Sequence, residues 1–389
     1  MQRRGFKMKK ALLVTHVSGF VPQFEMNNVR ILQHMGYEVH YASNFHNPSY
    51  GDDNSRLEGT GIVCHQIDFA RSPLKIENII AYKQLKHLMQ TIHFELVHCH
   101  TPVGGVLARL AAHATHTGPV IYTVHGFHFY TGAPIRNWLL YYPIERFLAR
   151  YTDMLITINE EDYQRAETFS AKPVRRIHGV GMSLEKKDIL LGAQLTELRK
   201  KLGLEDSDFI IVSAGELNKN KNQIMVLKAL SEMETQNYCY LVCGKGPLKE
   251  KLETYVKEHQ MQDRVRFLGY RKDLENILQL ADLFVMPSMR EGMPTAVMEA
   301  MKYQLPVVGT NIRGNRELIV EGKTGYLVPL NDSQEMAKKI LDIMDHPSLK
   351  KEMGERAAVK ITEYSSELVE QEMLKNYKEV IAAYKQGST

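Results

Sequence analysis

Short apolar runs alternate with polar or amphipathic segments along nearly the whole chain. Apolar runs of four to six residues between turn residues are typical of buried strands, and the longer segments between them have helical spacing. Strands are predicted at residues 11–14, 38–43, 95–100, 122–124, 154–158, 209–214, 238–243, 265–268, 283–286, 306–309 and 325–328. Helices are predicted at residues 23–34, 74–92, 130–151, 295–303 and 363–384. This alternation predicts an α/β protein with parallel, doubly wound sheets.

Two of the predicted helices carry faces that have more than one interpretation. In residues 74–92, isoleucine, leucine and methionine recur at helical spacing, and the lysines fall mostly on the other side. A core face with a solvated face is the favoured interpretation, and a basic surface for lipid headgroups is the alternative. Residues 130–151 combine aromatic side chains with three arginines. Aromatic core packing is favoured there over an acceptor-side or interfacial surface.

Composition narrows the class of protein. A chain of 389 residues with 44% hydrophobic and 24% charged residues is typical of two globular domains. The net charge of +4 is too small to predict a nucleic-acid partner. The excess lies in residues 1–185, which hold 19 Lys and Arg against 15 Asp and Glu. A basic first half suits an anionic membrane surface or a diphosphate acceptor, and an ordinary mixed surface explains it equally well.

Cysteine usage and apolar run length indicate a cytoplasmic protein. Cys64, Cys99, Cys239 and Cys243 lie in or beside strand-like runs, which predicts buried, reduced thiols. No apolar run approaches the roughly 18 residues of a membrane span. The basic start at residues 1–10 precedes only four apolar residues, so it favours a first strand over a signal peptide.

Residues 283–303 carry the strongest chemical signal. An apolar strand ends at Pro287, a polar loop follows, and Thr295 opens a predicted helix. A strand, a loop of backbone N–H groups and a helix N-terminus together form an anion site at the carboxyl edge of a sheet. Glu291 and Glu299 are separated by seven residues, about 12 Å along a helix. That spacing suits a long ligand better than the roughly 5–9.5 Å pair of a glycosidase, and two solvated carboxylates are the plainer alternative.

Histidines and glycines gather at strand ends in the first half. His98 and His100 lie two residues apart and therefore point to the same face of one strand, and His125 and His128 follow the next strand. Four histidines suggest zinc, but no acidic or cysteine ligand at metal spacing completes the set, so strand-end histidines are the favoured interpretation. The loop after the first strand has only Gly19, which argues against a dinucleotide fingerprint.

The run from Glu291 to Ala300 resembles the Glu-(seven residues)-Glu motif of family-4 retaining glycosyltransferases with the GT-B fold. His-x-His-Thr-Pro at 98–102 and Thr-Val-His-Gly at 123–126 resemble the first-domain signature of the same family. The resemblance spans roughly residues 8–380 and is greatest for bacterial exopolysaccharide and capsule transferases. It implies two Rossmann-like domains facing a central cleft. These are an acceptor domain at 1–182, onto which a final helix at 363–389 packs back, and a nucleotide-sugar domain at 183–362.

The resemblance also implies roles for individual residues. Lys221 matches the lysine that pairs with the donor diphosphate, and His125 matches a histidine that faces the transferred sugar. Glu216 stands where an arginine is expected, so it is expected to point away from the diphosphate. The implied catalytic residues are His125, Lys221 and Glu291. The implied donor-binding residues are Gly19, Gly215, Lys221, Gly244, Gly246, Arg271, Ser288, Glu291, Gly292, Met293, Pro294, Thr295 and Glu299.

The implied reaction moves a hexose or N-acetylhexosamine from a UDP-sugar to a lipid-linked or polysaccharide acceptor. No Asp-x-Asp motif appears in a strand-end loop, so neither a metal nor another cofactor is expected. The partners expected are the nucleotide-sugar donor, a lipid-linked glycan acceptor and the inner face of the membrane, in peripheral contact. The alternatives are a UDP-sugar epimerase of the GT-B fold and a catalytically weak nucleotide-sugar-binding partner protein.

Overall fold

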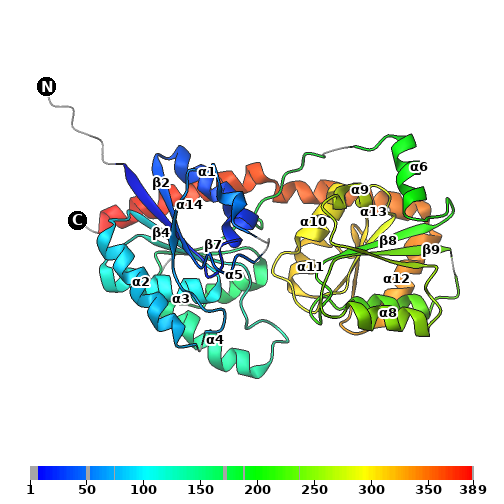
Figure 1. The fold of residues 1–389 in the computed structure, drawn as a ribbon, viewed down its shortest axis with the longest axis horizontal. Coiled ribbons are helices and arrows are strands. Elements are labelled where there is room, and N and C mark those ends of the chain that lie inside the picture. The colour runs from blue at the N-terminus through cyan, green and yellow to red at the C-terminus, as the bar shows by residue number, and fades with distance from the viewer. Residues whose placement is uncertain are drawn as a thin grey trace. The chain divides into compact units, whose positions relative to one another are not determined.

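The computed structural model describes residues 8–49, 53–73, 75–169, 173–186, 189–235 and 237–387 (Figure 1). The predicted basic lead at residues 1–7 and the first residue of the predicted helix 74–92 lie outside the described residues. The chain divides into two compact units. The first unit comprises residues 1–181 and 366–389, and the second comprises residues 182–365.

The first unit is built on a seven-stranded sheet in the order β3-β2-β1-β4-β5-β6-β7, with every neighbouring pair parallel. Its strands are β1 (Lys9–Val14), β2 (Tyr37–Ser43), β3 (Val63–Gln66), β4 (Leu96–His100), β5 (Val120–Val124), β6 (Met154–Thr157) and β7 (Val174–Arg176). Its helices are α1 (Met26–His34), α2 (Glu77–Thr91), α3 (Pro102–Thr115), α4 (Ile135–Leu148), α5 (Glu160–Ala166) and α14 (Ser366–Gly387). A π-helical turn, η1 (Val21–Glu25), leads directly into α1.

The second unit repeats the plan with a six-stranded parallel sheet in the order β10-β9-β8-β11-β12-β13. Its strands are β8 (Phe209–Ala214), β9 (Tyr238–Cys243), β10 (Val265–Gly269), β11 (Leu283–Met286), β12 (Val307–Thr310) and β13 (Gly325–Val328). Its helices are α6 (Gly192–Lys201), α7 (Gln223–Ser231), α8 (Lys249–Glu258), α9 (Leu274–Leu278), α10 (Thr295–Lys302), α11 (Arg313–Leu318), α12 (Ser333–Asp345) and α13 (Pro347–Lys360).

The α/β class predicted from the alternating pattern is confirmed. The central strands are buried along their length, as in β4 and β9, because helices cover both faces of a parallel sheet. The final helix α14 belongs to the first unit, where Tyr377 is fully buried and reaches His98 of β4. It lies beside α1, with which it makes direct contacts. The last segment of the chain thereby completes the core of the first unit.

One prediction about burial holds only in part, and another is wrong. Helix α2 buries Ala81, Leu85 and Met89 in the core of the first unit, but Ile79, Ile80 and the preceding Ile76 are more than half exposed. The helical spacing predicts one continuous core face, yet only the part of the helix from Ala81 onward packs into the core, beside α3. Cys64 was expected to be buried, but it is exposed because β3 is the edge strand of its sheet and has mostly exposed residues.

Helix α4 is divided between core and surface. Trp138, Tyr141 and Tyr142 pack against the first core, as the favoured interpretation predicted. Five large apolar side chains of the same helix are exposed: Ile135, Leu139, Leu140, Ile144 and Phe147. The helix therefore presents an unpartnered apolar surface as well as a core face.

Candidate active site

The candidate donor site lies where the strand order of the second sheet reverses. From β8 the chain proceeds outward through β9 and β10, whereas β11, β12 and β13 proceed to the other side. In open α/β sheets, ligands bind at this switch point, outside the carboxyl ends of the central strands. The loops after β8 and β11 are therefore neighbours, and they carry Lys221 and Glu291.

Asparagine side chains tie these two loops together. The amide of Asn220 donates to the carbonyl of Arg290 at 3.0 Å, and the Asn220 carbonyl accepts the Met289 N–H at 2.7 Å. Asn222 has a left-handed backbone with φ of 53° and donates to the carbonyl of Pro287 at 3.2 Å. These contacts fix the two strand-end loops relative to each other.

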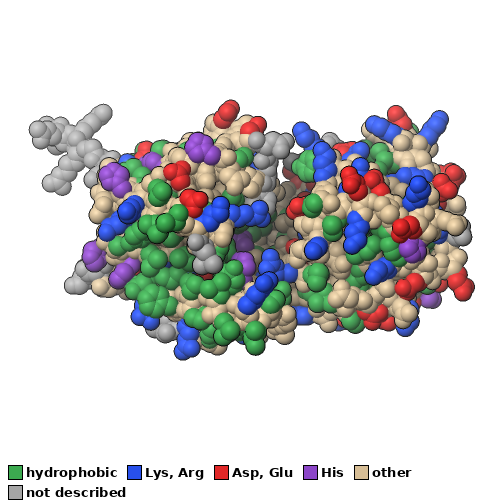
Figure 2. Space-filling view, turned by 60° about the horizontal axis from the view of Figure 1, so that its bottom comes forward, with side chains coloured by type: hydrophobic (Ala, Val, Ile, Leu, Met, Phe, Trp, Pro, Cys, Tyr) green, Lys and Arg blue, Asp and Glu red, His purple; other side chains and the backbone are tan. Residues whose placement is uncertain are grey.

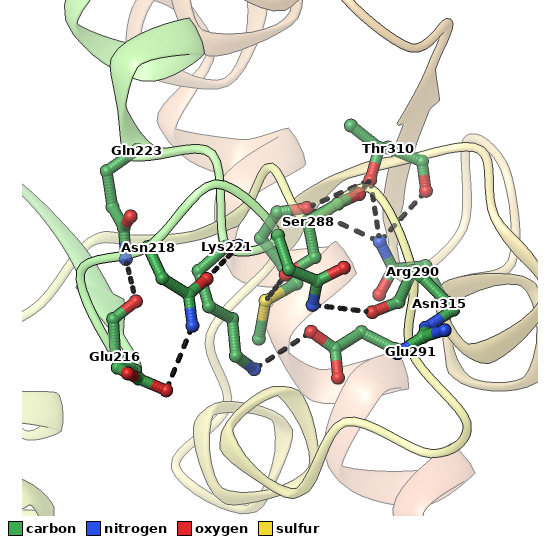
Figure 3. Close-up of polar contacts among 11 residues, drawn as sticks. Glu216, Asn218, Lys221, Gln223, Ser288, Arg290, Glu291, Thr310 and Asn315 are labelled. Carbon is green, nitrogen blue, oxygen red and sulfur yellow. Dashed lines mark hydrogen bonds and ion pairs between the residues drawn. The ribbon is translucent and has the colours of Figure 1, made fainter. Parts of the chain in front are cut away.

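Lys221 and Glu291 meet at the centre of this arrangement. The Lys221 Nζ lies 2.8 Å from Oε1 of Glu291, and both side chains are largely buried (Figure 3). The aliphatic part of Lys221 runs across Gly215, where a Cβ would lie 3.2 Å from it. Arg313 of α11 donates through Nε to the carbonyl of Glu291 at 3.3 Å. Two residues singled out separately in the sequence thus form one ion pair.

Glu216 points away from this pair. Its exposed carboxylate accepts the side-chain N–H of Asn218 at 2.9 Å, on the side of the loop opposite Glu291 (Figure 3). The carbonyl of the same Asn218 amide accepts the backbone N–H of Lys221 at 2.9 Å. Glu216 therefore orients the asparagine that shapes the Lys221 turn, and it lies where an acid does not face the lysine ammonium.

The glycines of this region serve close backbone packing. A Cβ on Gly244 would lie 1.8 Å from the carbonyl oxygen of Gly215, and Gly244 has φ of 157°. A Cβ on Gly246 would lie 2.4 Å from the carbonyl oxygen of Leu217. The two loops are also joined by the Leu217 N–H, which donates to the carbonyl of Lys245 at 2.9 Å. These positions require glycine because one backbone lies directly on another.

Ser288 is placed inside the protein rather than at its surface. It is fully buried, and its hydroxyl contacts the sulfur of Met286 at 3.2 Å. Its carbonyl accepts the hydroxyl of Thr310 at the end of β12. Asn315 of α11 donates to the carbonyls of Thr310 and Met286 at 2.8 and 3.3 Å. Buried polar groups from β12 and α11 therefore support the loop that carries Glu291.

Helix α10 begins directly after this loop without a side-chain cap, and Pro294 is its N-cap. Gly292 and Met293 are partly exposed and Thr295 is exposed, so N–H groups near the helix start are open to a ligand. Glu299 lies in the following turn. Burial raises the pKa of its carboxyl group, with Lys302 lowering it and Glu275 raising it to smaller extents.

Arg271 lies in the loop after β10, where it pairs with Asp273 at 2.6 Å. It is partly buried, while its neighbour Tyr270 is largely exposed. The loop therefore presents backbone and an aromatic side chain, while the guanidinium is held by an acid in the same loop.

In the first unit, Gly19 and His125 lie in loops after β1 and β5. A Cβ on Gly19 would lie 1.8 Å from the carbonyl oxygen of Ser49, so this glycine serves loop packing. His125 Nε2 lies 3.1 Å from Oε1 of Glu25 and 3.2 Å from Nδ1 of His100. No acidic partner for the histidines is evident from their spacing in the sequence, and the structure supplies Glu25.

The four histidines considered for zinc do not form one set. His98 is held by Tyr377 and by the hydroxyl of Thr123, each at 2.7 Å. Burial lowers the pKa of His98 to about 3 and the pKa of His100 well below its ordinary value. His128 stacks obliquely on Tyr141 of α4. Among the described residues, the group that could hold a metal is Glu25, His100 and His125.

Comparisons with known proteins agree with the architecture. Residues 9–159 match the family described as glycosyl transferase 4-like, and residues 195–360 match glycosyl transferases group 1. The structure of Anabaena HepE in complex with UDP superposes with a TM-score of 0.78 at 19% identity, covering 96% of this chain and all of that one. The chain therefore belongs to the glycosyltransferases of the GT-B fold.

Relatives narrow the class to bacterial exopolysaccharide glycosyltransferases. The chain is 36% identical to the Bacillus subtilis glycosyltransferase EpsD, over 95% of this chain and 96% of that protein. It is 28% identical to an Escherichia coli galactosyltransferase that acts on GlcNAc-diphosphoundecaprenol, over 87% of this chain and 88% of that one. The resemblance read from the motifs is confirmed, and the protein is a glycosyltransferase.

Proposed function

We propose that this enzyme transfers a hexose or N-acetylhexosamine from a UDP-sugar to a polyprenyl-diphosphate-linked glycan, with retention of anomeric configuration. The observation that carries the proposal is the Lys221–Glu291 pair beside the uncapped N-terminus of α10 at the sheet switch point. The diphosphate acceptor is supported by the Escherichia coli relative, whose acceptor is a diphosphoundecaprenol glycan. The basic first half of the chain suits an acceptor of that charge.

Each part of the donor has a candidate partner. Lys221 would neutralise the departing diphosphate, and the N–H groups of Gly292, Met293 and Thr295 would hold the nearest phosphate. Glu299 would accept the ribose hydroxyls, and Glu291 would accept a sugar hydroxyl. The loop carrying Arg271 would meet the base, and His125 would contact the transferred sugar. Glu291, whose Oε1 lies 2.8 Å from the Lys221 Nζ, would orient the ammonium toward the diphosphate.

No divalent metal is needed in this proposal. A lysine, a helix dipole and backbone donors together supply the charge that a metal would provide at the leaving diphosphate. A chelator should therefore leave the rate of UDP release unchanged, and restoration of lost activity by added Mg²⁺ or Mn²⁺ would contradict this.

We also propose that α2 and α4 of the first unit dock on an anionic lipid bilayer. Exposed apolar side chains of both helices lie on a face where hydrophobic side chains gather with lysines and arginines around them (Figure 2). The basic residues are Lys75, Lys83 and Lys86 near or on α2, and Arg136, Arg146 and Arg150 on or just after α4. Apolar insertion combined with basic charge is the usual chemistry of interfacial helices. In the described part of the chain, no helix is both long and apolar enough to span a bilayer.

Measuring UDP release over a panel of UDP-sugars, with and without lipid-linked glycans, tests the reaction. Acceptor-dependent release with one or two sugars is expected, and the anomeric coupling constant of the product reports retention. Conversion of the UDP-sugar without acceptor would instead indicate an epimerase. Binding without any release would indicate a nucleotide-sugar-binding partner.

Co-sedimentation with phosphatidylglycerol vesicles tests the docking surface. Leu139→Ser and Ile79→Ser should each reduce the bound fraction, because both side chains are more than half exposed. Val359→Ser, which removes an equally exposed apolar side chain from the second unit, is the matched control. Equal binding of all variants, or equal binding to neutral vesicles, would contradict the assignment.

A further inference from the structure

A buried carboxylate faces the histidine loop of the first unit. Glu25 ends the π-helical turn η1, and only 3% of its surface is exposed. Its Oε1 lies 3.1 Å from Nε2 of His125 and 3.5 Å from Nδ1 of His100. Its Oε2 accepts the side-chain amide of Asn28. A carboxylate this deeply buried is costly unless donors face it, so we expect the nearer imidazole, His125, to supply an N–H.

The protonation of the two imidazoles follows from this requirement. Burial lowers the pKa of His100 well below its ordinary value, so His100 is neutral and carries a single N–H. A hydrogen bond of 3.2 Å joins Nδ1 of His100 to Nε2 of His125, so only one of these two nitrogens carries a proton. Placed on Nε2 of His125, that proton also faces Oε1 of Glu25 at 3.1 Å. The other nitrogen of His125, Nδ1, then remains for a ligand. Within the described residues, no hydrogen bond occupies it.

The segment that carries Glu25 also packs on both rings. Phe20, directly before η1, meets the His125 ring edge-on with centroids 4.8 Å apart and lies 6.0 Å from the His100 ring. Turns of the π type are rare and frequently occur at functional sites, because the extra residue redirects one side chain. Here the redirected side chain is the carboxylate that faces His125.

The same three groups lie close enough to admit a metal ion, which is the alternative to the hydrogen-bonded arrangement. A histidine that binds a metal almost always donates its second ring N–H to a partner. The Nε2 of His100 is buried without a hydrogen-bond partner. Metal ligation through Nδ1 and acceptance of the His125 proton by Nδ1 both place that N–H on Nε2, so bound metal in the purified chain is measured directly.

We propose that Glu25 is a positioning residue for His125: it holds Nε2–H, so that Nδ1 accepts a hydroxyl group of the transferred sugar. The identity of the hydroxyl ligand rests on the proposed function. The hydrogen bond between Glu25 and His125 does not, so the two parts are tested separately.

NMR of the full chain with ¹⁵N-labelled histidine tests the hydrogen bond. The His125 signal, assigned by its loss in His125→Gln, should report the Nε2–H tautomer in the native protein. In Glu25→Gln it should move toward a mixture of tautomers. An Nδ1–H tautomer in the native protein, an unchanged signal in Glu25→Gln, or one equivalent of bound zinc in the purified chain would overturn the assignment.

A double-mutant cycle tests the positioning role. Glu25→Gln should lower kcat/KM roughly 10- to 100-fold, since it weakens a charge-assisted hydrogen bond. In the His125→Gln background the same substitution should change kcat/KM less than about twofold, because a positioning residue has nothing left to position. Additive losses would overturn the proposal. Glu77→Gln, which changes an exposed acid at the start of α2, is the control.

Two further observations keep the outcomes distinct. If Glu25→Gln does not fold, Glu25→Asp retains the charge and should keep both the tautomer and most of the activity. If the native enzyme releases no UDP with any acceptor, the proposed function fails, but the NMR result still decides the hydrogen bond.

Discussion

In the second unit, Lys221 and Glu291 meet because adjacent strands β8 and β11 end side by side and asparagines tie their loops together. In the first unit, His125 meets Glu25 through a π-turn and the packing of Phe20. The side chains of Lys221 and Glu291 are 23% and 13% exposed, whereas the Glu25 side chain in the first unit is only 3% exposed. A site for a diphosphate needs a cationic side chain that the ligand can reach. A site that binds one hydroxyl group needs a histidine held in a single protonation state.

The largest effect is expected from Lys221→Ala. Loss of the cation should lower kcat about 10²- to 10³-fold, as for other groups that stabilise developing charge on a leaving group. Glu291 would also lose its partner at 2.8 Å. Initial rates of UDP release measure the effect. Lys221→Arg should recover part of it, and Lys228→Ala, on the exposed side of α7, should have none. An unchanged rate in Lys221→Ala would remove the diphosphate assignment.

The packing of the glycine loops predicts a loss of stability in Gly244→Ala. The added Cβ would lie 1.8 Å from the Gly215 carbonyl oxygen, and the left-handed φ of 157° adds strain. We expect a cost of a few kcal/mol in the free energy of unfolding, seen as a lower Tm. Gly192→Ala, with no atom within 4 Å of its Cβ, should leave Tm nearly unchanged. Equal Tm values for Gly244→Ala and Gly192→Ala would show that the loop accommodates the added methyl group without loss of stability.

Glu299 links stability to donor binding. Because burial raises the pKa of its carboxyl group, the ionised form costs stability in the folded enzyme. Glu299→Gln should therefore raise Tm at pH values above the raised pKa. The gain should disappear as the pH falls toward the ordinary value, where the native residue is protonated. UDP binding should weaken by roughly tenfold, since the ribose hydroxyls lose a charged acceptor. A variant that binds UDP as tightly as the native enzyme would contradict the ribose assignment.

The sequence was sufficient for the second unit because its signals are contiguous. Residues 283–303 place a strand, a loop and a helix in one run, and the strand alternation predicted the sheet that carries them. Glu25 was missed because it is an isolated acid in a segment predicted as a plain helix. Ile79 and Ile80 were assigned to the core because helical spacing alone does not say where a helix stops packing. Contacts between distant segments and the limits of burial depend on the fold as a whole.

The asparagines near Lys221 form a sequence pattern that indicates the loop structure. Asn218, Asn220 and Asn222 alternate with lysine in the loop after β8, and each supplies a loop hydrogen bond. Asparagine is enriched in turns because its side chain bonds nearby backbone and tolerates left-handed φ. Three asparagines at alternate positions before a helix therefore indicate an ordered turn that is stabilised by side-chain hydrogen bonds.

The smallest change in kcat/KM is expected from substitution of Glu216. Its size tells whether this acid weakens the donor site or is a neutral part of the loop. Among the residues that the structure describes, the exposed Glu216 carboxylate contacts Asn218 alone, so Glu216→Ala should lower kcat/KM no more than about threefold. Asn218→Ala should have a larger effect, because Lys221 N–H loses its acceptor as well. If Glu216→Arg raises kcat/KM at least tenfold, then Glu216 weakens the donor site and the native enzyme is less active than the arginine variant. If the arginine leaves kcat/KM within threefold, this loop has replaced the family's second cation by an asparagine-built turn, and Lys221 alone supplies the charge.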